Sequence, residues 1–466
     1  MAVANTSHSP AELARLLKGA RTLWFIGIGG IHMSALAELS RQRGYRVAGS
    51  DTAENENTVR LSRAGIRVHP SHEAPQVIGA DAVIFTLAID EKNPEYLTAQ
   101  ALGIPLISRA DYLGYLMAEH RCRIAVAGTH GKSTVTTMLG ELLARAGRAP
   151  NILCGAAMRY FESPYFMGGD NSFVVEACEY GESFLSLSPT LAVVLNAELD
   201  HVDCYPDVAA VRRAMAAFAK KSARALLPLG DTALQAELTD YKGECFTFGE
   251  RGADFAALDI KDSPKGVSLT LAERGVPLGR ITMSQSGYHT AQNATAAFGA
   301  ARLSGMEAEE LLTFLPLFQG VHRRMEYRGL FCGAPVFDDY AHHPTEIACS
   351  IAAAREKVGG GRLFVLFQSH TYSRTRAFLS EIAAALCGAD RVLVTEIYAA
   401  RETDPLGVGG ALLAREVGAK ALFVPNVKAA ANALAAELRP SDLLIVMGAG
   451  DVDRIFLEFS KKHFTL

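Results

Sequence analysis

The sequence is poor in three features that would point to particular classes of protein. Its eight cysteines are scattered without a Cys-x-x-Cys pair, which argues against a disulfide framework or a structural zinc site. Its formal net charge is only −4, so neither a nucleic-acid footprint nor a polybasic membrane patch is expected. Its longest apolar runs, such as Ala82–Phe85 and Leu443–Met447, have the length of strands and fall short of a membrane span.

The amino terminus also lacks a basic segment followed by a long apolar run. We therefore expect a cytoplasmic protein with neither nucleic acid nor a membrane as a partner. What the sequence does have is length and apolar content. The chain has 466 residues, which is too long for a single hydrophobic core of ordinary size and predicts about three domains. Because 49% of the residues are hydrophobic, each domain can bury a core of its own.

Three regions each begin with a short apolar strand, a turn and a helical pattern. This repetition predicts an α/β protein of three domains, each with a largely parallel sheet wound by helices. The boundaries fall at residues 1–121, 122–326 and 327–466. We expect the first and third domains to be Rossmann-like and the central one to resemble a P-loop ATPase. Short alternating runs within residues 241–283 predict a small antiparallel insert.

Residues 127–133, Ala-Gly-Thr-His-Gly-Lys-Ser, contain the strongest single motif. A strand precedes them and a helix follows, which is the context of a phosphate-binding loop. Backbone N–H groups would hold the phosphates, Lys132 would neutralise them, and Ser133 would ligate Mg²⁺. Val126 stands where the usual pattern has its first glycine. The alternative is a glycine-rich turn with an exposed lysine and no ligand.

Acidic and histidine side chains follow the next two predicted strands. Glu176 ends one of them, and Asp200-His201 follows the other. Because parallel strands bring their carboxyl ends to one edge, Glu176 and His201 could each hold one Mg²⁺ beside the phosphates. The alternatives are a solvated loop acid and a histidine with a structural hydrogen bond.

A second glycine-rich turn lies near the amino terminus, where Gly27, Gly29 and Gly30 open a helix and Asp51 ends the next strand. The turn is similar to a dinucleotide fingerprint, although His32 replaces its sixth residue. The diphosphate of any nucleotide would suit it. A tight turn with a purely structural role is the alternative.

Two polar clusters in the third region, residues 338–346 and 368–376, follow strands and precede helices. Together they could bind a small zwitterion. Arg374 would take its carboxylate, and histidine or aspartate side chains would contact its amine. The alternative is that these polar residues only cap helices.

These motifs together resemble the Mur ligase family over roughly residues 20 to 455. The residues that carry the resemblance are the phosphate loop at 128–133, Glu-Ala-x-Glu at 176–179, the pair at 200–201, His289 with Asn293, and Arg323 with Arg324. The sequence departs from the family pattern at Cys178, His322 and Thr371, and the departure at Thr371 removes one expected contact to a carboxylate.

The resemblance implies ligands for most of these residues. ATP would contact Gly128, Thr129, His130, Gly131, Lys132, Ser133, Thr134, His289, Asn293, Arg324 and Asp339. Mg²⁺ would be held by Ser133, Glu176 and His201. A UDP-sugar would contact Gly27, Gly29, Gly30 and Asp51, and the amino acid would contact Tyr340, His342, His370 and Arg374. Catalysis would depend on Lys132, Glu176, His201 and His342.

The activity implied is that of the family members that use ATP and Mg²⁺ to join L-alanine to the carboxylate of UDP-N-acetylmuramate, through an acyl phosphate, in peptidoglycan precursor synthesis. The first domain would then bind the UDP-sugar, the second ATP and the third the amino acid. A monomer or weak homodimer is expected.

Three alternatives remain at this point. One is a recycling ligase that attaches a preformed murein peptide to the same nucleotide sugar. Another is a non-catalytic relative that binds nucleotide. The last is an NAD-dependent dehydrogenase, which would leave residues 128–133 unexplained.

Overall fold

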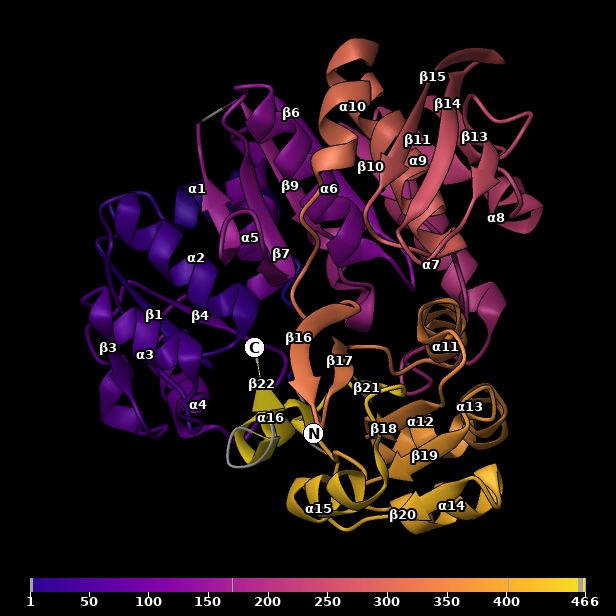
Figure 1. The fold of residues 1–466 in the computed structure, drawn as a ribbon. Helices are drawn as coiled ribbons and strands as arrows, with labels where there is room; N and C mark the ends of the chain where they lie inside the picture. Colours follow the sequence, from indigo (N-terminus) through magenta and orange to yellow (C-terminus); the bar gives the residue numbers. More distant parts are fainter. Residues whose placement is uncertain (1–2, 170, 401, 460–463, 466) are drawn as a thin grey trace.

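The computed structural model describes residues 3–169, 171–400, 402–459 and 464–465. It contains three sheets that follow one another along the chain, each with helices packed against it. Figure 1 shows the first part of the chain in indigo at the left, the central part at the top and the last part in orange and yellow at the lower right. The expected α/β architecture with largely parallel sheets is confirmed.

The first sheet has five strands in the order β3-β2-β1-β4-β5, all parallel. Its strands are β1 (Thr22–Ile26), β2 (Arg46–Ser50), β3 (Arg67–His69), β4 (Ala82–Phe85) and β5 (Leu106–Ser108). Its helices are α1 (Pro10–Leu16), α2 (Ile31–Gln42), α3 (Glu56–Arg63), η1 (Ala74–Val77), α4 (Pro94–Ala101) and α5 (Arg109–Ala118). The strand order reverses between β1 and β4, and ligands of such sheets bind at the carboxyl ends of strands at that point.

The central sheet has ten strands in the order β15-β14-β13-β12-β11-β10-β6-β9-β7-β8. Its strands are β6 (Cys122–Ala127), β7 (Asn151–Met158), β8 (Ser163–Met167), β9 (Ser172–Glu176), β10 (Leu191–Val194), β11 (Arg224–Pro228), β12 (Glu244–Gly249), β13 (Phe255–Lys261), β14 (Val267–Glu273) and β15 (Val276–Met283). Its helices are α6 (Lys132–Arg145), η2 (Tyr180–Ser186), α7 (Val208–Ala219), α8 (Thr232–Ala236), α9 (Tyr288–Leu303), α10 (Ala308–Phe314) and η3 (Leu315–Leu317).

The prediction of a small antiparallel insert at residues 241–283 is confirmed for β13 to β15 and wrong for β12. Strands β13, β14 and β15 do pair antiparallel, but β12 pairs in parallel with both β11 and β13. The segment therefore extends the central sheet. The inward side chains of β14 are buried in the same core as α9, so this extension shares the central core instead of forming its own.

The third sheet has the order β20-β19-β18-β21-β17-β16-β22. Its strands are β16 (Glu326–Phe331), β17 (Ala334–Asp339), β18 (Leu363–Phe367), β19 (Arg391–Val394), β20 (Ala421–Phe423), β21 (Leu443–Met447) and β22 (Phe464–Thr465). Its helices are α11 (Pro344–Val358), α12 (Tyr372–Ala377), α13 (Leu379–Leu386), α14 (Gly410–Val417), α15 (Val427–Glu437), η4 (Val452–Arg454) and α16 (Ile455–Phe459). The strands from β20 to β17 are parallel, whereas β16 pairs antiparallel with β17 and with β22.

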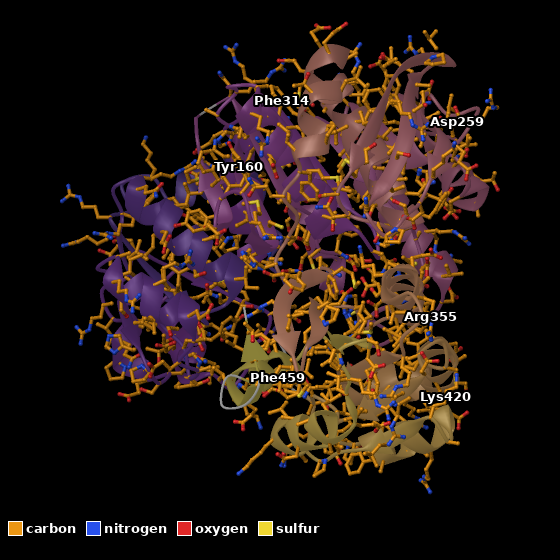
Figure 2. All side chains as sticks on the ribbon, in the orientation of Figure 1. Tyr160, Asp259, Phe314, Arg355, Lys420 and Phe459 are labelled. Carbon is orange, nitrogen blue, oxygen red and sulfur yellow. The ribbon has the colours of Figure 1, made fainter. Side chains whose placement is uncertain are left out.

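Aromatic packing holds the end of the described chain against this third sheet. The ring of Phe459, labelled in Figure 2, stacks on Phe331 with ring centroids 3.9 Å apart and also contacts Phe464. All the side chains of β18 and β21 are buried, as expected for central strands covered by helices on both faces. Within the described residues, we find no helix with the length and apolar character needed to span a bilayer.

Candidate active site

The loop between β6 and α6 leads into a helix whose first backbone N–H groups are open to a ligand, although the N–H of His130 donates to Asn196 Oδ1. No side chain caps α6, whose N-cap is Gly131 in the left-handed region with φ of 83°. A Cβ at Gly131 would lie 2.6 Å from Asn293 Oδ1, so glycine is required for space as well as for conformation. An uncapped helix start with free N–H groups is suited to bind phosphate.

Lys132 is held within this loop. Its ammonium donates to the carbonyl oxygens of Gly128 at 2.6 Å and Thr129 at 3.1 Å, and it pairs with Glu179 at 2.9 Å. Burial alone would lower the pKa of Lys132, but Glu179 raises it above its ordinary value. The lysine is therefore charged at neutral pH and directed at the inside of the loop, where phosphates would lie.

The strands on either side of β6 bring their ends to the same edge, as expected. Glu176 on β9 aligns with Val126 on β6, and its carboxylate accepts from the backbone N–H of Gly155 at 2.6 Å. On the other side, His201 follows β10, and its Nε2 lies 3.5 Å from Glu179 Oε1. Glu179 thus lies between Lys132 and His201, which joins the predicted phosphate and metal residues into one charged cluster.

The third sheet contributes Arg374 to this cluster. Its guanidinium forms two hydrogen bonds to the carboxylate of Asp200, at 2.9 and 3.1 Å, and a third at 3.1 Å to His370 Nδ1. Both partners of the ion pair are buried. Burial alone would raise the pKa of Asp200, but Arg374 and His201 hold it well below its usual value. The expected amino-acid pocket therefore adjoins the expected metal residues.

His342 lies beside this ion pair in a defined tautomer. Its Nδ1 is 2.9 Å from the carbonyl oxygen of Tyr340, which can only accept, so Nδ1 carries the proton and Nε2 has a free lone pair. Burial, with a further contribution from Arg374, lowers the pKa of His342 to about 4. The side chain is thus neutral at pH 7 and suited to accept a hydrogen bond from an amine, but it is a weak base.

Three sequence-family models match the chain in order: the catalytic domain of the Mur ligase family over residues 22–121, the Mur ligase middle domain over 126–301, and the glutamate ligase domain of Mur ligases over 323–450. The chain is 38% identical over 451 residues to UDP-N-acetylmuramate–L-alanine ligase of Agathobacter rectalis, covering 94% of this chain and 97% of that protein. The chain belongs to the Mur ligase family.

Another relative and two solved structures are also similar to this chain over most of its length. The chain is 37% identical to UDP-N-acetylmuramate–L-alanine ligase of Salinibacter ruber, covering 93% of each protein. The crystal structure of UDP-N-acetylmuramate–alanine ligase from Thermotoga maritima superposes with a TM-score of 0.81 at 27% identity, covering 94% of this chain and 98% of that one. A murein peptide ligase from Psychrobacter arcticus has the same fold, with a TM-score of 0.73 at 22% identity over 95% of this chain and 98% of that one.

The phosphate loop of this Mur ligase also contacts the third sheet directly. His130 has its Nδ1 3.2 Å from Glu346 and its Nε2 3.5 Å from Glu198. Nearby, Thr345 donates to Glu198 at 2.6 Å, and His343 Nε2 donates to the carbonyl of Leu199 at 3.0 Å. The start of α11 is thereby fixed against the loop and against the segment that leads to Asp200.

The side chains of His130, Glu198 and His343 place possible metal-ligand atoms within 4.8 Å of one another. However, both ring nitrogens of His343 are already engaged, because Nε2 donates to Leu199 and Nδ1 accepts from the backbone N–H of Thr345. Burial alone would lower the pKa of His130, but Glu198 and Glu346 raise it to about 9. We therefore interpret the cluster as an ion-pair junction around a protonated His130.

This junction predicts a pH-dependent stability. Because the pKa of His130 is raised to about 9 in the folded protein, the stabilisation is complete below its unfolded value near 6.5 and is lost as the pH rises through 9. Between pH 6 and 10, the free energy of unfolding of the unsubstituted protein should fall by up to about 3 kcal/mol more than that of His130→Asn. Urea denaturation of both proteins across this pH range measures the difference. Parallel pH profiles for the two proteins would contradict the junction.

The Arg374–Asp200 pair predicts a second stability effect. Arg374→Ala leaves a buried carboxylate without its partner and should cost about 3–5 kcal/mol. The double variant Asp200→Ala/Arg374→Ala buries no unpaired charge and should be the more stable of the two. Urea-denaturation midpoints of the two variants make the comparison, and equal midpoints would show that the unpaired carboxylate of Asp200 carries no penalty, which would contradict this prediction.

Other expected site residues have structural partners already. Asp51 accepts from the backbone N–H of Gly29 at 2.8 Å, so it braces the first glycine turn. Asp339 accepts from the backbone of Ala341 and from the Ser350 hydroxyl. Thr371, with φ of 65°, caps α12 by accepting from the backbone N–H of Arg374.

The remaining expected residues surround the loop from α9 and from the segment that precedes β16. His289 and Asn293 are one turn apart on α9, and Asn293 faces Gly131. Arg324 lies over the ring of Tyr340, 5.3 Å from its centroid, and its guanidinium is 3.6 Å from Glu346. Ser133 is buried at the start of α6, and Thr134 follows it. The turn at Gly27, Gly29 and Gly30 opens α2, which has no side-chain cap.

Two residues of this site were missed as functional candidates in the sequence. Glu346 ends the polar cluster at 338–346 but was given no role of its own, and the structure shows that it contacts both His130 and Arg324. Arg109 contacts His32 at 3.1 Å beside the first glycine turn. Its signal was an arginine directly after β5, at the carboxyl edge of the first sheet.

Proposed function

We propose that this Mur ligase uses ATP to join L-alanine to the carboxylate of UDP-N-acetylmuramate, in peptidoglycan precursor synthesis. Its full-length similarity to ligases of that name supports the assignment. The observation that carries it is the Arg374–Asp200 ion pair. It brings a carboxylate-binding arginine of the third sheet to the strand end that adjoins the phosphate loop, so an amino acid bound there would lie beside an activated acyl group.

The three parts of the chain would then hold one substrate each. Residues 1–121 would bind the UDP-sugar at the first glycine turn, residues 122–326 would bind ATP, and residues 327–466 would bind alanine. A cavity of about 570 Å³ lies beside the phosphate loop and is lined in part by Asn196, Tyr288 and Gln292. Its volume is in the range of nucleotide sites, so it could receive the nucleoside part of ATP.

The donor groups at the loop are consistent with Mg²⁺. Oxygen ligands suit this ion, and the Ser133 hydroxyl and Glu176 carboxylate provide them, with His201 available on the other side. A Cβ at Gly155 would lie 2.9 Å from the Glu176 carboxylate, so glycine at this position leaves the carboxylate its space. Bound there, Mg²⁺ would neutralise charge on the phosphates and on the acyl phosphate.

The reaction would proceed in two steps. An oxygen of the muramate carboxylate attacks the γ-phosphorus of ATP, the bond to ADP breaks, and an acyl phosphate forms. The uncharged amine of alanine then attacks the acyl carbon, the C–O bond to the phosphoryl group breaks, and inorganic phosphate leaves with the proton that the amine loses. Lys132 offsets charge on the transferred phosphoryl group, and Arg374 holds the alanine carboxylate through the N–H that Asp200 and His370 leave free.

His342 would position the amine. Its Nε2 lone pair can accept an N–H hydrogen bond from alanine, and the low pKa makes this role more suitable than full proton abstraction. Because the acyl phosphate would hydrolyse in water, the three parts of the chain must enclose it. The direct contacts between the phosphate loop and α11 are consistent with such an enclosure.

A phosphate-release assay tests this function. Purified protein with ATP, Mg²⁺, UDP-N-acetylmuramate and L-alanine should release phosphate and form a product heavier than the nucleotide sugar by one alanine residue, detected by mass spectrometry. Omission of any one substrate should abolish the amide product. Phosphate release that proceeds equally without the nucleotide sugar would contradict the proposal, and absence of any turnover would favour a relative that only binds nucleotide.

A further inference from the structure

Arg109 is a half-buried arginine for which the described residues provide no carboxylate partner. It begins α5, directly after β5, and its guanidinium contacts His32 Nδ1 at 3.1 Å. Within the described part of the chain, no aspartate or glutamate forms an ion pair with it, and burial lowers the pKa of Arg109 without a carboxylate to offset the effect. A guanidinium held out of water in this way is suited to receive an anion from a ligand.

His32 supplies a second donor at the same place. An arginine N–H can only donate, so His32 Nδ1 accepts from Arg109 and Nε2 carries the ring proton. Nε2 is buried and, among the described residues, forms no hydrogen bond of good geometry, although it interacts with the backbone carbonyl of Cys154. Burial, and then Arg109, lowers the pKa of His32 to about 4, so the ring is neutral. Among the described residues, the Arg109 guanidinium thus contacts no acceptor besides His32, and His32 Nε2 adjoins only the carbonyl of Cys154.

The packing of α2 and α5 shows where Arg109 and His32 lie relative to the central sheet. Helix α2, which carries His32, packs against β7 and β8, and α5 packs against η2, so both residues lie where the first and central sheets meet. Burial and Glu179 raise the pKa of Cys178, while Lys132 and Arg109 act to lower it, so Arg109 lies within electrostatic range of the residues that follow β9. His32 likewise interacts electrostatically with Glu176 at the end of β9. The pair therefore lies near the strand end beside the phosphate loop.

We propose that Arg109 and His32 bind the carboxylate of the nucleotide-sugar substrate and direct it at the γ-phosphate of ATP. The inference rests on the proposed function and adds residues that hold the nucleophile. The backbone N–H groups at the uncapped start of α2 remain available for the diphosphate of the same substrate. Arg109 and His32 would then contact the part of the ligand nearest the loop, which is the lactyl carboxylate.

A comparison of two nucleotide sugars isolates the contribution of the carboxylate to binding. UDP-N-acetylmuramate carries the lactyl carboxylate, and UDP-N-acetylglucosamine has the same nucleotide and a sugar without it. Isothermal titration calorimetry should show that Arg109→Met weakens the binding of UDP-N-acetylmuramate roughly 10- to 100-fold, the range for a lost hydrogen bond to a charged group. Binding of UDP-N-acetylglucosamine should change by less than about twofold, and Arg109→Lys should recover part of the loss.

Two controls distinguish a loss of carboxylate binding from a loss of folding or of diphosphate binding. Arg67→Met alters an exposed arginine at the start of β3, away from the carboxyl edge, and should leave both affinities unchanged. Retained binding of UDP-N-acetylglucosamine shows that the Arg109→Met variant is folded. Equal weakening of both ligands would assign Arg109 to the diphosphate or to the fold and overturn the proposal, as would no weakening of either. If the unsubstituted protein binds neither nucleotide sugar, the proposed function itself is wrong.

Discussion

Lys132→Ala is expected to reduce phosphate release by about a thousandfold or more while the protein stays folded. The lysine is charged, lies inside the phosphate loop, and has only Glu179 as an ionic partner among the described residues. Removal of one preorganised group that stabilises transition-state charge typically costs a factor of 10²–10³, and a phosphoryl group in transfer depends strongly on such charges. Steady-state release of phosphate with all substrates saturating measures the effect.

Lys242→Ala is the matched control, because Lys242 is an exposed lysine before β12 on the same sheet. It should retain full activity. Thermal unfolding should be compared as well, since Lys132→Ala leaves the buried carboxylate of Glu179 with a weaker set of partners. If folded Lys132→Ala protein turns over at the rate of Lys242→Ala, then residues 128–133 do not bind the reacting phosphates.

Glu176→Gln should lower the rate by about a hundredfold or more and raise the Mg²⁺ concentration needed for half-maximal activity. The carboxylate lies at the end of β9, next to the phosphate loop, and it is the acidic oxygen ligand expected for the ion. An amide keeps the hydrogen bond from Gly155 but loses the charge that attracts Mg²⁺. The rate should therefore be measured across a titration of Mg²⁺.

Glu244→Gln, at an exposed position on β12, is the control for this second variant and should show an unchanged titration. A parallel loss of rate at every Mg²⁺ concentration, with no change in the concentration required, would show that Glu176 acts without the ion. Full activity of Glu176→Gln at ordinary Mg²⁺ concentrations would show that Glu176 is not part of the active site.

The parts of the fold that the sequence predicts are those in which buried strands lead to glycine turns. The strand before residues 128–133 and the helix after them, the helix opened by the first glycine turn, and the strand that ends at Glu176 lie where the sequence predicts them, because apolar runs between turn residues define them. Strands β3, β7, β8, β11 and β16 were not predicted. Strands β3, β8 and β16 lie at or next to sheet edges and have few buried side chains. Strands β7 and β11 are largely buried, but Gly155 interrupts the apolar run of β7, and β11 has only three apolar residues between Arg224 and Pro228.

The candidate site likewise contains contacts that can be predicted from the sequence and contacts that cannot. Lys132, Glu176 and His201 could be placed near one another from the sequence, since adjacent parallel strands end at one edge. The contacts of His130 with Glu346 and of Arg374 with Asp200 could not, because each joins residues more than 170 positions apart on different sheets. No local pattern encodes how separate sheets meet.

The phosphate-release assay with UDP-N-acetylmuramate and different amino acceptors is the most direct test of the proposed activity. L-Alanine should give the highest kcat/KM, and the preformed peptide L-Ala-D-Glu-diaminopimelate should give little or no release. The pair of Arg374 and Asp200 is buried, which suits a small acceptor. Efficient turnover of the tripeptide with none of alanine would contradict the account and identify a recycling ligase instead.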